Sequence, residues 1–348
     1  MVVLGADLHK RSHTIVVIDE TGRKLAEKTI AATAEGHLEL RRWAARWPER
    51  RWGLEDCRHL SRRLEADLVR AGEDVVRVSP KLMAGTRRSI REPGKSDPID
   101  ALAVARAVLR EPDLPVATLE GPERALRLLV DHREDLVGER TRHEQRLRWF
   151  LVELAIAEPA SRSLGRARVQ AALAAALADR PEPASRFARD LLARIVELTG
   201  AIRGLEREIE AVVAPLAPTL LALPGCGPLT AAKLVGETAG IIRFRSKEAF
   251  ARHNGSAPVP VWSGNVVRHR LSRGGNRQLN AALHRIAITQ IRLDGPGKVY
   301  LAHRMTDGDT RTEAIRALRR RISDEVFRRM RHDEALQATA RAPLAAAA

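Results

Sequence analysis

Hydrophobic and polar residues follow two different periods along this chain. In the first third, short apolar runs bounded by turn residues predict strands at 2–4, 14–18, 24–30, 51–54 and 75–78. Helical spacing predicts helices at 35–45 and 60–71, and a further helix opens within 95–101. A β-meander followed by alternating helices and strands is typical of an α/β domain.

The middle of the chain has the period of long helices. Residues 123–153 form a charged stretch without proline, and a second run places apolar residues at an alternating four-three spacing. Its members are Leu191, Ile195, Leu198, Ile202, Leu205, Ile209 and Val212. This spacing predicts a coiled-coil seam, either in an antiparallel hairpin with the first stretch or between two copies of the chain. Residues 180–183 read as a linker, and Pro215 and Pro218 are expected to end the second helix.

The last third opens with a glycine-rich turn at 223–232, in which a Pro-Gly-x-Gly sequence leads into a helix. It resembles a helix-hairpin-helix element, whose backbone N–H groups bind phosphate, although an ordinary turn between helices explains it too. Residues 257–264 predict a rigid loop ahead of a basic cluster. A helix at 312–331 is expected to pack on the domain, to lie on nucleic acid or to expose a basic face, and a loosely ordered tail follows.

Four carboxylates in the first third are the strongest candidates for chemistry. Asp7 and Glu55 follow predicted strands, while Asp97 and Asp100 are three residues apart and share one face of a helix. Hard divalent cations prefer carboxylate oxygens, and a two-metal site activates an attacking oxygen while stabilising a leaving one. The set therefore indicates a metal-dependent phosphoryl-transfer enzyme.

Each acid also has a simpler explanation. Asp97 followed by Pro98 suits a helix N-terminus, where a side-chain cap and a first-turn proline are both favoured. Glu55 and Asp7 are also acceptable as polar residues at a strand end and in a turn. Capping does not explain Asp100.

The composition favours a polyanionic partner. Lys and Arg total 60 against 44 Asp and Glu, which gives a net charge of +16, and arginine matches phosphate geometry well. Biased usage of arginine and alanine is the alternative explanation. Cys57 and Cys226 lack the spacing of a disulfide framework or a zinc site. With no signal peptide or apolar run of membrane length, we expect a soluble cytoplasmic protein, associated with the nucleoid and not with a membrane.

These motifs together resemble the DEDD transposases of the insertion-sequence-110 group over nearly the whole chain, up to about Arg331. The resemblance rests on Asp7-Leu8-His9-Lys10, Glu55, Asp97-Pro98-Ile99-Asp100-Ala101, the 224–231 turn, Ser263-Gly264 and Gly275-Asn276. It implies an α/β RNase H/RuvC-like N-terminal domain at 1–115. An α-helical coiled-coil connector at 116–214, a mostly α-helical C-terminal transposase domain at 215–332 and a flexible tail at 333–348 would follow.

The resemblance also implies a recombinase. The four acids would bind Mg²⁺ or Mn²⁺, and Ser263 would attack DNA to give a covalent phosphoserine. Partners would be donor and target DNA, a structured guide RNA encoded by the element, and further copies of the chain in a dimer or tetramer. Expected nucleic-acid contacts are Gly225, Gly227, Thr230, Arg268, Arg270, Arg273, Asn276 and Arg277. A RuvC-like Holliday-junction resolvase or nuclease that uses water, and a non-catalytic nucleic-acid-binding protein, remain alternatives.

Overall fold

The computed structural model describes residues 1–55, 60–79, 82, 96–111, 114, 116–117, 121–157, 164–263, 266–270 and 275–345. Of residues 263, 266–269 and 340–345 it describes the backbone alone. The chain divides into two compact units, Met1–Glu120 and Gly121–Ala348, and each is described by itself.

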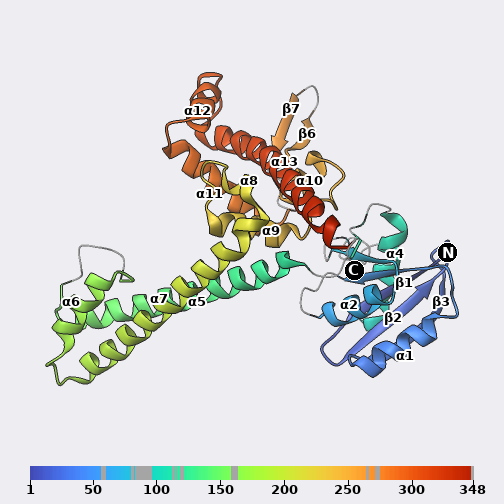
Figure 1. Ribbon diagram of the computed structural model, residues 1–348, viewed down its shortest axis with the longest axis horizontal. Coiled ribbons are helices and arrows are strands. Elements are labelled where there is room, and N and C mark those ends of the chain that lie inside the picture. Colours follow the sequence, from blue (N-terminus) through green and yellow to red (C-terminus); the bar gives the residue numbers. More distant parts are fainter. Residues whose placement is uncertain are drawn as a thin grey trace. The chain divides into compact units, whose positions relative to one another are not determined.

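The first unit is built on a mixed five-stranded sheet (Figure 1). Its strands are β1 (Val2–Leu8), β2 (Ser12–Ile18), β3 (Lys24–Ala31), β4 (Arg50–Glu55) and β5 (Val75–Val78), in the spatial order β3-β2-β1-β4-β5. The first three strands pair antiparallel, whereas β4 is parallel to both β1 and β5. All five predicted strands are present, and the mixed sheet with its helices confirms the predicted α/β class of this domain.

Helices cover both faces of this sheet. Helices α1 (Ala34–Ala44) and α2 (Arg62–Arg70) pack on one face against alternate strand residues such as Leu4 and Trp52. Helix α4 (Asp97–Arg110) packs on the other face against residues such as Val3 and Val78. Because successive strand residues point to opposite faces, the apolar runs of β1, β2 and β5 serve two cores at once.

Strand β1 is longer than the sequence predicts. Asp7 was expected in a turn, but it lies within the strand and pairs with Thr14 of β2. The predicted apolar run ended at Leu4, yet Gly5 and Ala6 continue the ladder because β1 is central and is hydrogen-bonded on both sides.

The second unit begins with a long helical hairpin (Figure 1). Helix α5 (Pro122–Glu153) and helix α7 (Pro183–Leu216) run antiparallel, with α6 (Ala167–Leu177) between them in sequence. Two ion pairs mark the direction: Arg194 lies 2.7 Å from Glu139, and Arg133 lies 2.5 Å from Glu206. The two long helices therefore form an antiparallel hairpin within one chain, which is one of the two arrangements that the sequence predicts. The buried stripe of α7 uses four of the predicted seam positions, namely Ile195, Leu198, Ile202 and Ile209.

The remaining helices surround one further core. They are α8 (Pro218–Leu221), α9 (Pro228–Thr238), α10 (Lys247–His253), α11 (Arg277–Arg292), α12 (Pro296–Thr306) and α13 (Arg311–Ala345). Leu318, Ile322, Val326 and Met330 of α13 are buried in this core. The apolar face of the last helix thus packs on the domain. None of the helices in the described part of the chain combines the length and the apolar character of a membrane span.

Two segments differ from their predicted form. The loop expected at 257–264 contains strand β6 (Val259–Ser263), which pairs antiparallel with β7 (Val266–Arg270). Pro260 is accepted there because a two-stranded hairpin leaves one edge of each strand unpaired.

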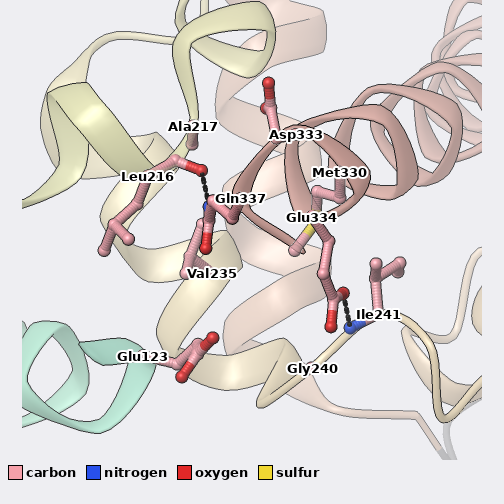
Figure 2. Close-up of a pocket in the computed structure, with 10 residues that line it drawn as sticks. All are labelled: Glu123, Leu216, Ala217, Val235, Gly240, Ile241, Met330, Asp333, Glu334 and Gln337. Carbon is pink, nitrogen blue, oxygen red and sulfur yellow. Dashed lines mark hydrogen bonds between the residues drawn. The ribbon is translucent and has the colours of Figure 1, made fainter. Parts of the chain in front are cut away.

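The tail expected from residue 333 continues as helix to Ala345. Gln337 donates to the carbonyl of Leu216 at 2.5 Å, and the carboxylate of Glu334 accepts from the backbone N–H of Ile241 at 3.1 Å (Figure 2). Asp333 accepts from the N–H groups of Thr219 and Leu220, the second and third residues of α8. These bonds hold the end of α13 on the α7–α8 junction.

Candidate functional site

The four predicted acids lie on three neighbouring elements of the first unit. Asp7 is on β1, and Glu55 is the last residue of the adjacent parallel strand β4. Asp97 and Asp100 occupy the first turn of α4, which packs against β1. Asp7 and Asp100 are buried, at 5% and 4% exposed.

A glycine brings the helix this close to the strand. A Cβ at Gly5 would lie 2.3 Å from both the carbonyl oxygen of Ala101 and the backbone nitrogen of Ala105. Any side chain at this position would push α4 off β1, and with it Asp97 and Asp100. Gly5 therefore fixes the spacing between the acid on the strand and the acids on the helix.

His9 joins two of the acids. Its Nε2 lies 3.1 Å from Oδ2 of Asp7 and 3.3 Å from Oδ1 of Asp97. One potential ligand atom from each of these three residues lies within 4.8 Å of the others. The imidazole thus sits between a carboxylate of the sheet and a carboxylate of the helix.

The geometry also decides between two interpretations of Asp97. Helix α4 is preceded by Ser96 in the N-cap position, and Asp97 is the first helical residue, followed by Pro98. The Oδ1 atom of Asp97 lies 3.3 Å from Nε2 of His9, and Asp97 is not the cap residue. Capping does not account for the presence of this acid.

The surroundings of Asp7 disfavour its ionised form. Burial raises the pKa of Asp7 above its ordinary value, and the nearby carboxylates of Asp100, Asp97 and Glu55 raise it further. His9 acts in the opposite direction. A cation between these groups would remove the repulsion that raises the pKa.

The donor set fits a hard divalent metal ion. Carboxylate oxygens of Asp7 on β1 and Asp97 on α4 converge with a ring nitrogen of His9, and hard cations of the Mg²⁺ type take carboxylate oxygens as ligands. Asp7, Glu55, Asp97 and Asp100 are the residues that would hold it, with His9 beside them.

In the second unit, Ser263 is the last residue of β6 and pairs with Val266. Its side chain lies outside the described part of the structure, as do the side chain of Arg268 and the whole of Arg273. The register pairs Val261 with Arg268 and Val259 with Arg270, and directly paired residues share a face of a ladder. Ser263, Arg268 and Arg270 therefore belong to the same face of the hairpin.

The glycine-rich turn leads into a helix as predicted, but its residues differ in role. Gly225 has a φ of +84°, and a Cβ there would lie 3.1 Å from the carbonyl oxygen of Ile286 on α11. Thr230 is buried, at 5% exposed. Gly227, in contrast, is exposed at the N-terminus of α9, and a Cβ would meet nothing within 4 Å. Of these three residues, only Gly227 has space beside it.

The Gly275-Asn276 motif is used within the fold. A Cβ at Gly275 would lie 2.2 Å from the backbone nitrogen of Gly255. The side-chain oxygen of Asn276 caps α11 by accepting from Gln278 N and Leu279 N, at 2.9 and 3.1 Å. Its amide nitrogen donates to Glu237 of α9 at 2.8 Å. Arg277, the next residue, is exposed.

Three residues that bear on these sites were not identified as such in the sequence. His9 belongs to a family motif, but its contact with Asp97 does not follow from the sequence, because the two residues are far apart along the chain. Gly5 carries a signal, because glycine inside a strand often marks a close backbone approach. Glu237, 4% exposed on α9, gave no signal in the sequence.

Two family models match the chain, one over most of the first unit and the start of the second, and the other within the second unit. A family model described as a transposase, that of the DEDD transposases of IS110, matches residues 4–156. A second model, described as the transposase family of IS116, IS110 and IS902, matches residues 217–302.

Individual relatives show the same similarity. The chain is 27% identical to an uncharacterised 44.8 kDa protein of insertion element IS116 from Streptomyces clavuligerus, over 94% of both chains. It is 26% identical to an uncharacterised 42 kDa protein of insertion element IS900 from Mycobacterium paratuberculosis, over 91% of this chain and 92% of that one. A probable family 20 transposase of Pseudomonas aeruginosa is 29% identical over 53% of each chain.

Among solved structures, RuvC of Thermus thermophilus is similar at 16% identity and a TM-score of 0.28, over 34% of this chain and all of that one. The same protein in complex with a Holliday junction substrate is similar at 17% identity and a TM-score of 0.25, over 31% of this chain and 91% of that one.

Proposed function

Because the chain belongs to the IS116/IS110/IS902 family of transposases, we propose that it cuts and rejoins DNA through a covalent phosphoserine, with a metal site in its first unit. The cluster of Asp7, His9 and Asp97, with Asp100 and Glu55 in electrostatic range of Asp7, is the observation that carries the proposal. Asp100, Asp97 and Glu55 add to the effect of burial in raising the pKa of Asp7, and a bound cation would offset their contribution.

The metal part of the proposal assigns Asp7, Glu55, Asp97 and Asp100 as ligands of Mg²⁺ or Mn²⁺. When bound, the ion would stabilise the negative charge that develops on the phosphate and on the leaving oxygen. The chain's own contribution is placement: Gly5 lets α4 approach β1, so that acids from the helix and the sheet face one volume.

The covalent part assigns Ser263 as the nucleophile. Its Oγ would form a bond to phosphorus while the bond from phosphorus to a bridging oxygen of the DNA backbone breaks. The serine proton passes to that leaving oxygen, which departs as a hydroxyl group. Attack by another DNA hydroxyl on the phosphoserine reverses the exchange, so the phosphodiester energy is kept and no high-energy cofactor is needed.

The nucleic-acid part of the proposal assigns residues of the second unit to contacts with the phosphate backbone of DNA. Arg268 and Arg270 share the hairpin face of Ser263, and their charge would stabilise the extra negative charge of the transition state. Gly227 and Arg277, which are exposed at the N-termini of α9 and α11, are assigned to phosphate contacts. Arg273 is assigned to the same interface. Gly225, Thr230 and Asn276 would support it from within the fold.

An element-encoded guide RNA and a dimer or tetramer complete the proposal, with donor and target DNA as substrates. The net charge of +16 is in keeping with polyanionic partners of both kinds. Joining separate DNA ends also requires more than one active site, which favours assembly of several copies.

The test is an adduct assay. The protein would be incubated with Mg²⁺, RNA transcribed from its own element, and donor and target DNA, and the products separated on a denaturing gel. We expect a protein–DNA adduct that Ser263→Ala abolishes. Ser256→Ala is the matched control, because Ser256 is a nearby serine in the same unit, and it should leave the adduct unchanged.

Three other outcomes would contradict the proposal in different ways. An adduct retained by Ser263→Ala but lost in Ser256→Ala would identify Ser256 as the nucleophile in place of Ser263. Cleavage without any adduct would indicate a nuclease that uses water. Binding without cleavage under any divalent metal would reduce the chain to a nucleic-acid-binding protein.

A further inference from the structure

We propose that His9 is a ligand of the metal ion, coordinating it through Nε2 beside Asp7 and Asp97, and that it shifts the preference of the site toward transition metals. The inference rests on the proposed metal site and deepens it, because the family-type set of ligands consists of four carboxylates. His9 would add a nitrogen to an otherwise all-oxygen site.

The first argument is spacing. Neighbouring ligands of an octahedral ion at 2.0–2.1 Å lie about 2.9 Å apart. The Nε2 atom of His9 lies 3.1 Å from the Asp7 oxygen and 3.3 Å from the Asp97 oxygen. Both distances are within a few tenths of an ångström of that spacing, and one ligand atom from each of Asp7, His9 and Asp97 lies within 4.8 Å of the other two.

The second argument is hydrogen bonding. A neutral imidazole has one N–H, so Nε2 can donate only one proton although it faces two carboxylate oxygens. Both contacts at a single nitrogen suit a shared cation better than two separate hydrogen bonds. Coordination requires the lone pair of Nε2, which places the ring proton on Nδ1.

The third argument is that the main chain of His9 is fixed while its ring is free to adjust. His9 directly follows β1, and its backbone N–H donates to the carbonyl of Ser12 at 3.0 Å, which fixes the main chain. Its side chain is 48% exposed, so the ring can adjust by the small distance that coordination demands. Asp7 beside it is buried and held in the ladder.

A nitrogen ligand has a chemical consequence. Mg²⁺ prefers oxygen donors, whereas Co²⁺ and neighbouring transition metals gain affinity from imidazole. His9→Gln should therefore weaken Co²⁺ binding about tenfold or more, and Mg²⁺ binding much less. Dissociation constants from calorimetry on the full-length protein would give this ratio without any activity measurement.

The decisive test is spectroscopic. The full-length protein would be loaded with Mn²⁺, and electron spin echo envelope modulation would be recorded to detect a directly bound nitrogen. We expect a ¹⁴N coupling in the unmodified protein that is absent in His9→Gln while Mn²⁺ remains bound.

His303→Gln is the matched control. His303 is exposed and its Nδ1 lies 2.9 Å from a carboxylate oxygen of Asp307, so it represents an ordinary histidine–carboxylate pair on the surface. Loss of the coupling in His303→Gln would assign the signal to adventitious binding and overturn the inference.

Failure of this inference and failure of the metal site give different results. If Mn²⁺ binds, Asp7→Asn abolishes binding and no nitrogen coupling appears, His9 is not a ligand but the metal site stands. If the unmodified protein does not bind Mn²⁺ at all, the metal site itself is wrong.

Discussion

The two units use their family motifs in opposite ways. In the first unit, carboxylate oxygens of Asp7 and Asp97 lie 3.1 and 3.3 Å from the same nitrogen of His9. In the second unit, Gly225, Gly275 and Asn276 are explained by close backbone contacts and by helix capping. The contacts of the second set are those of structural residues, whereas the contacts of the first set are those expected of the proposed metal ligands.

The largest expected effect tests the chemical side of this comparison. Asp97→Asn should lower DNA cleavage and joining about 10³-fold, because metal stabilisation of the transition state contributes several kcal/mol. Asp74→Asn is the control, since Asp74 is similarly exposed in the same unit and pairs with Arg51, at 2.6 Å. It should stay within about twofold. If Asp97→Asn and Asp74→Asn reduce the amount of joined DNA equally in an end-point assay, Asp97 has no special role.

Asn276 tests the structural side. Asn276→Ala removes a helix cap and leaves Glu237 without one buried partner, so the free energy of unfolding should fall by about 2 kcal/mol. Asn276→Asp keeps the cap but sets a carboxylate against Glu237, and it should destabilise the protein as well. Urea unfolding of the full-length chain measures both. Weaker DNA binding with unchanged unfolding would mean that this side chain contacts nucleic acid.

Two glycines of one turn sharpen the comparison further. Gly225→Ala forces an alanine to a φ of +84° and should cost about 1–2 kcal/mol of stability. Gly227→Ala meets open space, so stability should be preserved while DNA affinity falls, if phosphate approaches the N-terminus of α9 there. Thermal unfolding and a DNA titration at fixed salt report the two effects. The reverse pattern would exchange the roles of the two glycines.

The smallest effect concerns Asp7 without metal. Because the pKa of Asp7 is raised in the folded state, its ionised form lowers stability at neutral pH, and this cost disappears as the pH falls through the folded pKa. Asp7→Asn should therefore raise the free energy of unfolding at pH 7 by on the order of 1 kcal/mol or less. The gain should shrink toward acid pH. Urea unfolding in EDTA at several pH values measures it, and a gain that grows toward acid pH would contradict the assignment.

The sequence predicted the elements better than the contacts between them. The strands of the first unit follow from apolar runs, but the small residues Gly5 and Ala6 hid the continuation of β1 to Asp7. Proline at 258 and 260 suggested a loop where β6 forms, because nothing local reveals that β7 pairs with it. The four acids were found from their order along the chain. The contact between His9 and Asp97 was not, since it depends on how α4 packs against β1.

The length of the antiparallel hairpin can be compared with the helical repeat of B-form DNA. Val130 belongs to the core that α8 to α13 surround, whereas Leu151 belongs to a separate core at the other end of α5. The 21 helical steps from Val130 to Leu151 rise about 31 Å. That is about nine base pairs, close to one full turn of B-form DNA. A duplex lying along the hairpin would therefore present nearly the same groove to both ends.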